Sequence, residues 1–523
     1  MVDDDASAGA EPMDPSRAEP TTGPDNVVVV LLDSLNRHLL GSYGGDEFTT
    51  PNLDAFAARS TRFTEHHTGS LPCMPARHDI LCGALDFLWR PWGSVEIWED
   101  AITRSLRSAG VTTQLISDHP HLFETGGENY HTDFSAWAYE RGHENDPWKT
   151  VPDPSWMGAP TTAGRGMPMH YDESRTWFRG EADFPGPRTM AAAADWIDDN
   201  AGHHDRFLLF VDEFDPHEPF DTPDPWASRY DPDWEGPHLI WPPYLRGAQR
   251  KGVLDERQAR QIRAQYGAKL SMIDHWFGRV LDALDRHGLW ESTAVIVCTD
   301  HGHYLGEDDT WGKPAVPIGS TMGHIPLMVW WPGAEPGECD ALTTSVDLFA
   351  TLADVFGVDV RQRTHGRSLV PLLTGSATSV RDWLITGIWG REVHLVDLER
   401  RYCRAPVGDN APISMWSNRW STMPLHVLDP EVALPLPDHR AVLDRMPGST
   451  VPVIRQPWGD GDGLPFWAWA NFDGSHLWDR TDDPHETHDL VGARVERDAA
   501  EKLRVALVEL DAPDDQFVRL GLA

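Results

Sequence analysis

Residues 26–33, NVVVVLLD, decide the fold of this chain. They form a run of β-branched and leucine residues without polar alternation, which is typical of a strand covered on both faces, as in a parallel sheet. The run ends on Asp33. Residues 293–300, TAVIVCTD, repeat the pattern and end on Asp300, and residues 206–217, RFLLFVDEFDPH, contain a third such run. The sequence therefore predicts an α/β fold built on a mostly parallel sheet.

Polar residues follow each of these runs. Asp33, Asp212, Asp300 and His217 stand at or just after the carboxyl ends, which form the edge where open α/β sheets bind ligands. Between residues 266 and 284, apolar residues recur at spacings of three and four and predict an amphipathic helix that leads into the Asp300 strand. We therefore expect the functional site at this edge of the sheet.

Length and charge limit the classes of function. A chain of 523 residues suits one large domain and a smaller one. Its net charge of −38 and its five lysines argue against nucleic acid or an anionic membrane surface as partner, because both need clustered basic residues. No run of 18 apolar residues exists, so we expect no membrane span.

Changes in composition divide the chain into three parts. We expect residues 1–25 to form a disordered acidic tail, residues 26–378 the main domain, and residues 379–523 a C-terminal subdomain. Residues 140–190 and 215–250 are rich in Pro, Trp, Asp and Gly with little periodicity. They are predicted to be long loops over the functional edge of the sheet.

The cysteines indicate a reducing compartment. There are five, at 73, 82, 298, 339 and 403, and no pair has the C-x-x-C spacing. An odd number in a long chain is a poor disulfide framework. The N-terminal stretch has no basic segment followed by an apolar one, as a signal peptide would. A cytoplasmic location is therefore expected.

Residues 69–83, GSLPCMPARHDILCG, place one of these cysteines in an unusual setting. Pro75 suits the first turn of a helix, so Cys73 would lie about at its N-cap, where free N–H groups and the helix dipole favour an anion. Arg77 follows one turn later and can reach the same anion, and Gly83 would end the helix. The alternative is a buried cysteine near a turn.

The pattern Cys73-x-Pro75-x-Arg77 resembles the signature of the sulfatase family, in which a maturation enzyme converts the cysteine to formylglycine. The resemblance extends in the right order over residues 26–492. Its further segments are NVVVVLLDSLNRHLLGSYG, TPNLDAFAARSTRF, PHEPF, TDHGHYLGE and SHLWDRTDDPHETHDLVG. It implies an alkaline-phosphatase-like α/β sandwich with a central, mostly parallel sheet and a smaller C-terminal α+β subdomain.

The resemblance also implies a set of site residues. The expected metal ligands are Asp33, Cys73, Asp300 and His301, around one divalent ion, Mn²⁺ or Ca²⁺, with Zn²⁺ the third choice. The expected catalytic residues are Cys73, Arg77, His119, His121, His217 and Lys313. His119 stands where many sulfatases have lysine. In the implied reaction Asp300 accepts a proton from the attacking formylglycine hydroxyl, His217 and Lys313 act on the leaving group and sulfate, and His121 is the base that releases sulfate.

Two positions depart from the common sulfatase pattern. Ser34 replaces a second Asp, and His301 replaces an Asn. Both changes resemble the phosphonate monoester hydrolase branch. We therefore expect hydrolysis of a small-molecule sulfate monoester, with phosphonate or phosphate mono- or diesters as the alternative substrates. A non-catalytic binding protein of the same fold is the third hypothesis. The formylglycine-generating enzyme is the expected maturation partner, and a homo-oligomer stays open.

Overall fold

The computed structural model describes residues 23–155, 170–360, 362–420, 437–459, 462–464, 468, 470, 472, 474–483, 486–492 and 494–523. Most of the expected acidic tail, residues 1–22, and the middle of the first predicted loop, residues 156–169, lie outside the described residues. Among the described residues, no helix is both long and apolar enough to span a bilayer.

The eight-stranded central sheet is organised around β1, Asn26–Leu32. This strand pairs in parallel with β6, Phe207–Glu213, on one side and with β8, Thr293–Cys298, on the other. The strands beyond them are β4 (Thr112–Ser117) and β5 (Ala136–Tyr139) next to β6, and β11 (Leu327–Trp330), β2 (Thr61–Phe63) and β12 (Gly337–Cys339) next to β8. Only β11 runs antiparallel to its neighbours. The predicted mostly parallel sheet is confirmed.

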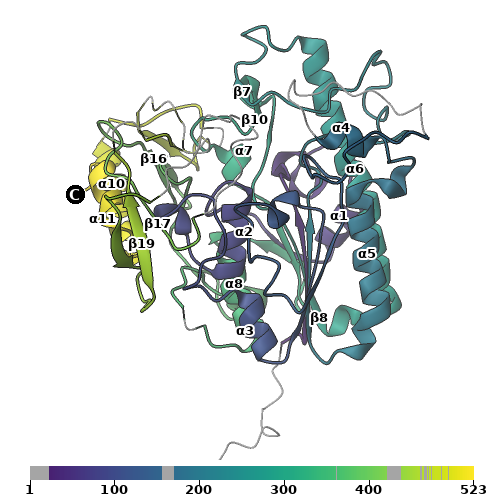
Figure 1. The fold of residues 1–523 in the computed structure, drawn as a ribbon, viewed down its shortest axis with the longest axis horizontal. Helices are drawn as coiled ribbons and strands as arrows, with labels where there is room; N and C mark the ends of the chain where they lie inside the picture. Colours follow the sequence, from purple (N-terminus) through teal and green to yellow (C-terminus); the bar gives the residue numbers. More distant parts are fainter. Residues whose placement is uncertain are drawn as a thin grey trace, which may run out of the picture.

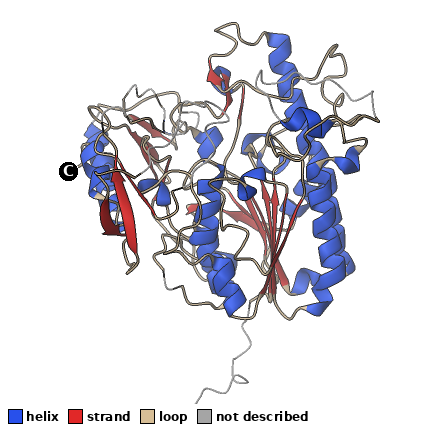
Figure 2. Ribbon diagram, viewed as in Figure 1, coloured by secondary structure: helices blue, strands red, loops and turns tan. Residues whose placement is uncertain are grey.

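Helices cover both faces of this sheet (Figures 1 and 2). One face carries α1 (Pro51–Ala58), α5 (Pro185–Asn200) and α6 (Glu256–Arg286), and the other carries α2 (Cys73–Cys82), α3 (Ile102–Ser108) and α8 (Asp347–Phe356). Alternate residues of β1 serve the two layers: Val28 and Val30 pack with the α5–α6 side, and Val27 and Val29 pack with the α2–α8 side. This explains why the sequence of β1 shows no polar alternation.

The predicted amphipathic helix is α6, whose apolar residues from Tyr266 to Leu284 are buried. Asp255 caps its first turn by accepting a hydrogen bond from the backbone N–H of Gln258. Gly288 follows the helix with a φ of 61°, in the left-handed region that glycine adopts without strain.

The C-terminal part has its own sheets, at the left of Figure 1. One contains β14 (Leu384–Gly387), β15 (Val393–Val396), β16 (Arg400–Arg404) and β20 (His476–Asp479), all antiparallel. The other contains β17 (Ser414–Ser417), β19 (Pro452–Pro457) and β18 (Val442–Arg445), and the helices are α10 (Arg494–Glu509) and α11 (Asp514–Arg519). Its buried cluster also includes Phe87, Leu88 and Trp89 of the main part. A domain boundary near residue 378 stays a prediction.

The predicted long loops contain more structure than expected. The segment 140–190 includes α4 (His170–Arg175) and the start of α5, and a buried apolar cluster joins this segment to residues 240–241 of the second loop. Its aromatic side chains lack a regular spacing, so the sequence showed no periodicity. The remaining short elements are β3 (His66–His67), β7 (Leu245–Arg246), β9 (Tyr304–Leu305), β10 (Thr310–Gly312), β13 (Thr343–Thr344), α7 (Ser320–Gly323) and α9 (Val370–Leu373).

Candidate active site

Three aspartates meet at the carboxyl edge of the central sheet. Asp33 follows β1, Asp212 lies near the end of β6, and Asp300 follows β8 by two residues. Because these strands are adjacent and parallel, their ends bring the carboxylates together, and all three are buried. The sequence pattern predicted this edge, although it did not single out Asp212 as a site residue.

Arg77 holds the three carboxylates from helix α2. Its Nε donates to Asp212 Oδ2 at 2.8 Å and its Nη2 lies 2.6 Å from Asp212 Oδ1 and 2.9 Å from Asp33 Oδ2. Its Nη1 donates to Asp300 Oδ2 at 2.8 Å. The planar guanidinium can make these contacts at once, which a lysine could not. Arg77 thus holds the N-terminal half of α2 over the ends of the three strands.

Cys73 was predicted at about the N-cap of this helix, but the N-cap is Pro72 and Cys73 is the first residue of α2. Gly83 ends the helix with a φ of 78°, as predicted. The Sγ of Cys73 lies 3.2 Å from Nε2 of His301. The helix start therefore presents the thiol directly to the residues at the sheet edge.

The four expected metal ligands lie together. One donor atom from each of Asp33, Cys73, Asp300 and His301 lies within 4.8 Å of the others, and all four residues are buried. His301 Nδ1 donates to the carbonyl oxygen of Gly302 at 2.9 Å, since a carbonyl can only accept. This leaves the Nε2 lone pair pointing into the group, as metal-binding imidazoles do.

The local charges also fit a divalent cation. Three buried carboxylates face one guanidinium, so two negative charges stay unbalanced within this set. Burial by itself would raise the pKa of Asp33, but Arg77 and the other basic groups around it outweigh this and lower the pKa, so Asp33 is ionised. A divalent ion would supply the missing positive charge.

Lys313 and His217 face the same site from two loops. Lys313 Nζ lies 2.6 Å from His217 Nε2, and His217 Nδ1 donates to the carbonyl oxygen of Glu218 at 2.7 Å. Burial lowers the pKa of His217 to about 4, so its ring is neutral. Burial alone would also lower the pKa of Lys313, but Tyr244 and acidic neighbours raise it well above its usual value. The pair therefore consists of an ammonium group and a neutral imidazole.

His119 and His121 occupy different environments. His119 is fully buried, its Nε2 lies 3.6 Å from Asp33 Oδ2, and neither ring nitrogen has a hydrogen-bond partner among the described residues. His121 lies between two acids, with its Nδ1 on Glu124 and its Nε2 3.3 Å from Glu144. Burial opposes a charged ring, yet Glu124 and Glu144 raise the pKa of His121 to about 10. The predicted role of His121 as a base conflicts with this charge state.

Ser34 fits the site although it replaces an expected carboxylate. Its hydroxyl donates to Asp33 Oδ1 at 2.8 Å and accepts from Lys313 Nζ at 3.4 Å. Its backbone N–H donates to Asp300 Oδ1 at 3.1 Å. Its φ of 62° is unusual for a residue other than glycine and marks the sharp turn after β1. Ser34 therefore links three of the predicted site residues.

The sequence analysis missed a buried lysine that supports the His217 loop. Lys269 Nζ of α6 lies 2.6 Å from Asp215 Oδ1 and donates to the carbonyl oxygen of Pro219 at 2.6 Å. His143 Nε2 lies 2.7 Å from the same carboxylate oxygen of Asp215. These contacts bracket the segment that contains His217. The available signal was a lysine, rare in this chain, on the apolar stripe of a predicted helix.

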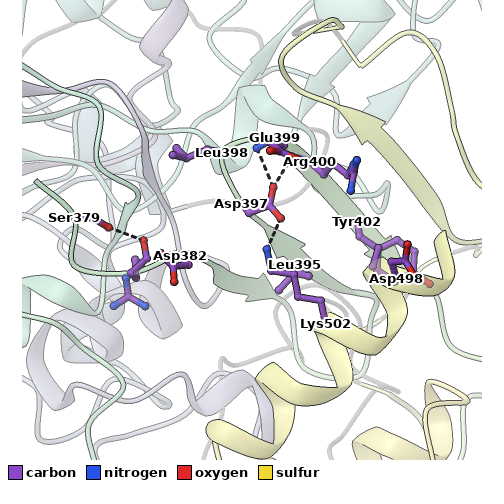
Figure 3. Close-up of a pocket in the computed structure, with 12 residues that line it drawn as sticks. Ser379, Asp382, Leu395, Asp397, Leu398, Glu399, Arg400, Tyr402, Asp498 and Lys502 are labelled. Atoms are coloured by element: carbon purple, nitrogen blue, oxygen red, sulfur yellow. Dashed lines mark hydrogen bonds and ion pairs between the residues drawn. The ribbon is translucent and has the colours of Figure 1, made fainter. Parts of the chain in front are cut away.

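A separate hollow lies in the C-terminal part and contains none of the predicted site residues (Figure 3). Asp397 at its centre accepts hydrogen bonds from the backbone N–H groups of Glu399 and Arg400 and from Lys502 Nζ. The backbone and side-chain groups around this hollow thus already supply hydrogen bonds to Asp397.

Known proteins resemble this chain over most of its main part. The sulfatase family model matches residues 25–358. The choline-sulfatase of Rhizobium meliloti (strain 1021) is 30% identical over 382 residues, which cover 68% of this chain and 72% of that protein. The multifunctional alkaline phosphatase superfamily protein PehA of Trinickia caryophylli is 25% identical over 425 residues, covering 68% of this chain and 78% of that protein.

A solved structure gives the matching fold. The phosphonate monoester hydrolase of Agrobacterium radiobacter superposes with a TM-score of 0.62 at 18% identity, covering 94% of this chain and 95% of that one. This likeness confirms the expected alkaline-phosphatase-like architecture.

Proposed function

The chain belongs to the sulfatase family, and we propose that it hydrolyses sulfate monoesters with a formylglycine made from Cys73 and one divalent metal ion. The observation that carries this proposal is the group of four donors, Asp33, Cys73, Asp300 and His301, within 4.8 Å of one another. A single cysteine among hard oxygen and imidazole ligands at a helix start fits a nucleophile precursor. The formylglycine-generating enzyme would act on it before the site is complete.

The expected groups would supply the central chemistry. When bound, a divalent ion held by Asp33, Asp300 and His301 supplies Lewis acidity, and the formylglycine hydrate at 73 supplies a nucleophilic hydroxyl. Arg77 keeps the two aspartates and the start of α2 in register through its ion pairs. The remaining steps depend on which side chains of this protein donate and accept protons.

Lys313 and His217 are suited to the leaving-group side. The Lys313 ammonium can donate a proton or a hydrogen bond to an ester oxygen as negative charge develops there. His217 fixes that ammonium through its Nε2 lone pair. His119, with unpartnered ring nitrogens beside Asp33, is the imidazole placed to accept a proton during sulfate release. His121, paired with its two acids, would instead pack against His119 and fix its position; the two ring centres are 5.2 Å apart.

A phosphonate or phosphate ester hydrolase is the second candidate. The presence of His301 and Ser34 favours it, and so does the structural likeness to a phosphonate monoester hydrolase. The two candidates share the fold and the nucleophile and differ in the substrate anion. The assay must therefore vary that anion alone.

The deciding experiment compares sulfate, phosphate and phosphonate esters of one aryl leaving group, with protein co-expressed with the maturation enzyme. We expect the highest kcat/KM for the sulfate ester and an aldehyde in place of the Cys73 thiol by mass spectrometry. Cys73→Ala should abolish turnover, whereas Cys403→Ala, at a buried cysteine of β16, should retain it. A preference for phosphonate would select the second candidate, and wild-type protein inactive on all esters would favour a binding protein.

A cytoplasmic location is part of the proposal. It is supported by the five cysteines, all of which lie in the described part of the chain and none of which forms a disulfide there. Substrates would then be small esters already inside the cell. Cell fractionation tests this, and recovery of a disulfide-linked protein outside the cell would contradict it.

A further inference from the structure

A second group of metal-binding residues lies at the far end of helix α2 from Cys73. His78 and Cys82 are four residues apart and share one face of this helix, and Glu99 approaches them from the segment before α3. One donor atom of each lies within 4.8 Å of the others, and all three side chains are buried. The reaction at Cys73 uses none of them.

A fourth ligand lies beside this group. His78 Nε2 lies 2.8 Å from Glu99 Oε1 and 3.8 Å from Asp86 Oδ2. Asp86 is 5% exposed, and its Oδ2 has no hydrogen-bond partner among the described residues. Ligand atoms around a tetrahedral zinc ion lie about 3.3–3.7 Å apart, given bonds of about 2.0–2.3 Å. The two separations from His78 Nε2 bracket this spacing. The donors of His78, Cys82 and Glu99 already lie within 4.8 Å of one another, and the ion would draw Asp86 in as the fourth ligand.

We propose that His78, Cys82, Glu99 and Asp86 bind a structural zinc ion. A thiolate, an imidazole and two carboxylates form a four-ligand set that suits zinc, whereas calcium and magnesium select oxygen ligands alone. The closed, buried set leaves no position for a substrate, which is typical of a structural ion. This inference is independent of the function proposed above.

The charges of the cluster favour an exchange of protons for the ion. Around it lie three acids and three bases: Asp86, Glu96, Glu99, His78, Arg90 and Arg363. Cys82 has to lose its thiol proton to bind the ion, because the thiolate is the form that binds metals. Zinc binding therefore exchanges protons of the cluster for the two positive charges of the ion.

The surroundings supply the other parts of a metal site. Glu99 Oε2 accepts from the backbone N–H of Glu96 at 2.7 Å, and Asp86 Oδ1 accepts from Arg363 Nη2 at 2.8 Å. These bonds orient both carboxylates without using the oxygen atoms nearest His78. A small cavity bordered by His78, Asp86 and Arg90 adjoins the cluster. The ion would tie the end of α2 to the segment that follows it.

The test counts zinc in full-length protein that carries Cys73→Ala, which removes the thiol of the active site. We expect Cys73→Ala/Cys82→Ser to contain one zinc ion fewer per chain than Cys73→Ala alone. The matched control is Cys73→Ala/Cys403→Ser, which alters a buried cysteine outside the cluster and should lose none. Equal zinc content in all three proteins would overturn the proposal.

A spectroscopic measurement covers the case in which the Cys82→Ser protein fails to fold. Metal-stripped Cys73→Ala protein is titrated with Co²⁺. We expect a thiolate-to-cobalt charge-transfer band in the near ultraviolet that saturates at one equivalent and disappears when Zn²⁺ is added, and we expect cobalt binding to release protons. A protein that binds Co²⁺ without this band, or binds none, would show that Cys82 is not a ligand.

Discussion

Lys313 Nζ lies 2.6 Å from His217 Nε2, and the ammonium group donates a hydrogen bond to the imidazole lone pair. The orientation is fixed from the other side, because His217 Nδ1 donates to the carbonyl oxygen of Glu218. His217 therefore cannot donate from Nε2 while it is neutral. Of the two side chains, Lys313 is the one that carries a transferable proton next to the site.

Lys313→Met should lower kcat/KM about 10²- to 10⁴-fold, which is the range for loss of a general acid. The loss should be largest for esters with poor leaving groups, because these need the proton most. The measurement is kcat/KM across a series of aryl esters of increasing leaving-group pKa. Lys251→Met, at an exposed lysine whose Nζ donates to the backbone carbonyl of Arg246, is the control. An equal loss for every leaving group would mean that Lys313 binds the substrate anion without transferring a proton.

Lys269→Met should destabilise the fold and slow turnover together. The change removes the ammonium partner of buried Asp215, which keeps its contact with His143, and it frees the Pro219 carbonyl, so we expect a loss of about 3–5 kcal/mol in the free energy of unfolding. Urea unfolding and kcat measure the two effects. Adding Asp215→Asn should recover part of the stability, since it removes the buried charge that has lost its ammonium partner.

Lys502→Met is the comparison for Lys269→Met, because Lys502 also pairs with an aspartate but is more exposed. Lys502 Nζ bonds Asp397 at 2.6 Å, but its side chain is 40% exposed. We expect this variant to lose less than about 1 kcal/mol, as exposed pairs do. Similar losses in the Lys269 and Lys502 variants would contradict the assigned role of the buried pair.

The pH dependence of stability should report on His121. Its folded-state pKa of about 10 lies above the ordinary value of 6.5, with Glu124 and Glu144 as the stabilising partners. The charged ring contributes fully below pH 6.5, and this contribution is lost as the pH rises through 10. In the alkaline range, Tm should therefore fall more steeply for the wild type than for His121→Asn. His170→Asn, at an exposed histidine, should keep the wild-type slope, and parallel curves for all three proteins would contradict the prediction.

The sequence predicted the edge of the sheet and the main members of the site. Uninterrupted apolar runs identified β1, β6 and β8, and their parallel pairing then required Asp33 and Asp300 to meet. Cys73 and Arg77 followed from helix spacing, because positions four apart share a face. The resemblance to sulfatases added Lys313 and the metal ligands. The structure brings the four expected metal ligands together, and their roles in catalysis and metal binding stay predictions.

The remaining features depend on contacts between distant segments. The charge of His121 depends on Glu124 and also on Glu144, and Glu144 lies in a segment without periodicity, so its contribution could not be predicted from the sequence. Asp212 was recognised as a strand-end residue, but its pairing with Arg77 required the packing of α2 over β6. The clustering of His78 with Glu99 likewise depends on how the chain returns after α2. The spacing of residues within a motif carries no information on contacts between distant segments.

The ligand set at the sheet edge predicts the metal preference of the active site. Ser34 supplies a hydroxyl in place of a carboxylate, and His301 offers Nε2 in place of an amide oxygen. Calcium favours six to eight oxygen ligands and gains mainly from their charge. Imidazole together with carboxylates suits manganese or zinc better. These two ligand differences should therefore weaken the binding of calcium more than the binding of manganese.

Metal-stripped protein should bind Mn²⁺ more tightly than Ca²⁺ and regain more activity with it, and His301→Asn should shift both preferences towards Ca²⁺. Isothermal titration with each ion measures binding apart from catalysis, and elemental analysis of protein purified without added metal identifies the resident ion. His303→Asn is the matched control: His303 is buried nearby, but its Nε2 lies 3.1 Å from Glu218 and it does not belong to the four-ligand group. It should leave the order of affinities unchanged. Tight calcium binding that His301→Asn does not alter would place His301 outside the metal shell, and the argument from its nitrogen ligand would fail.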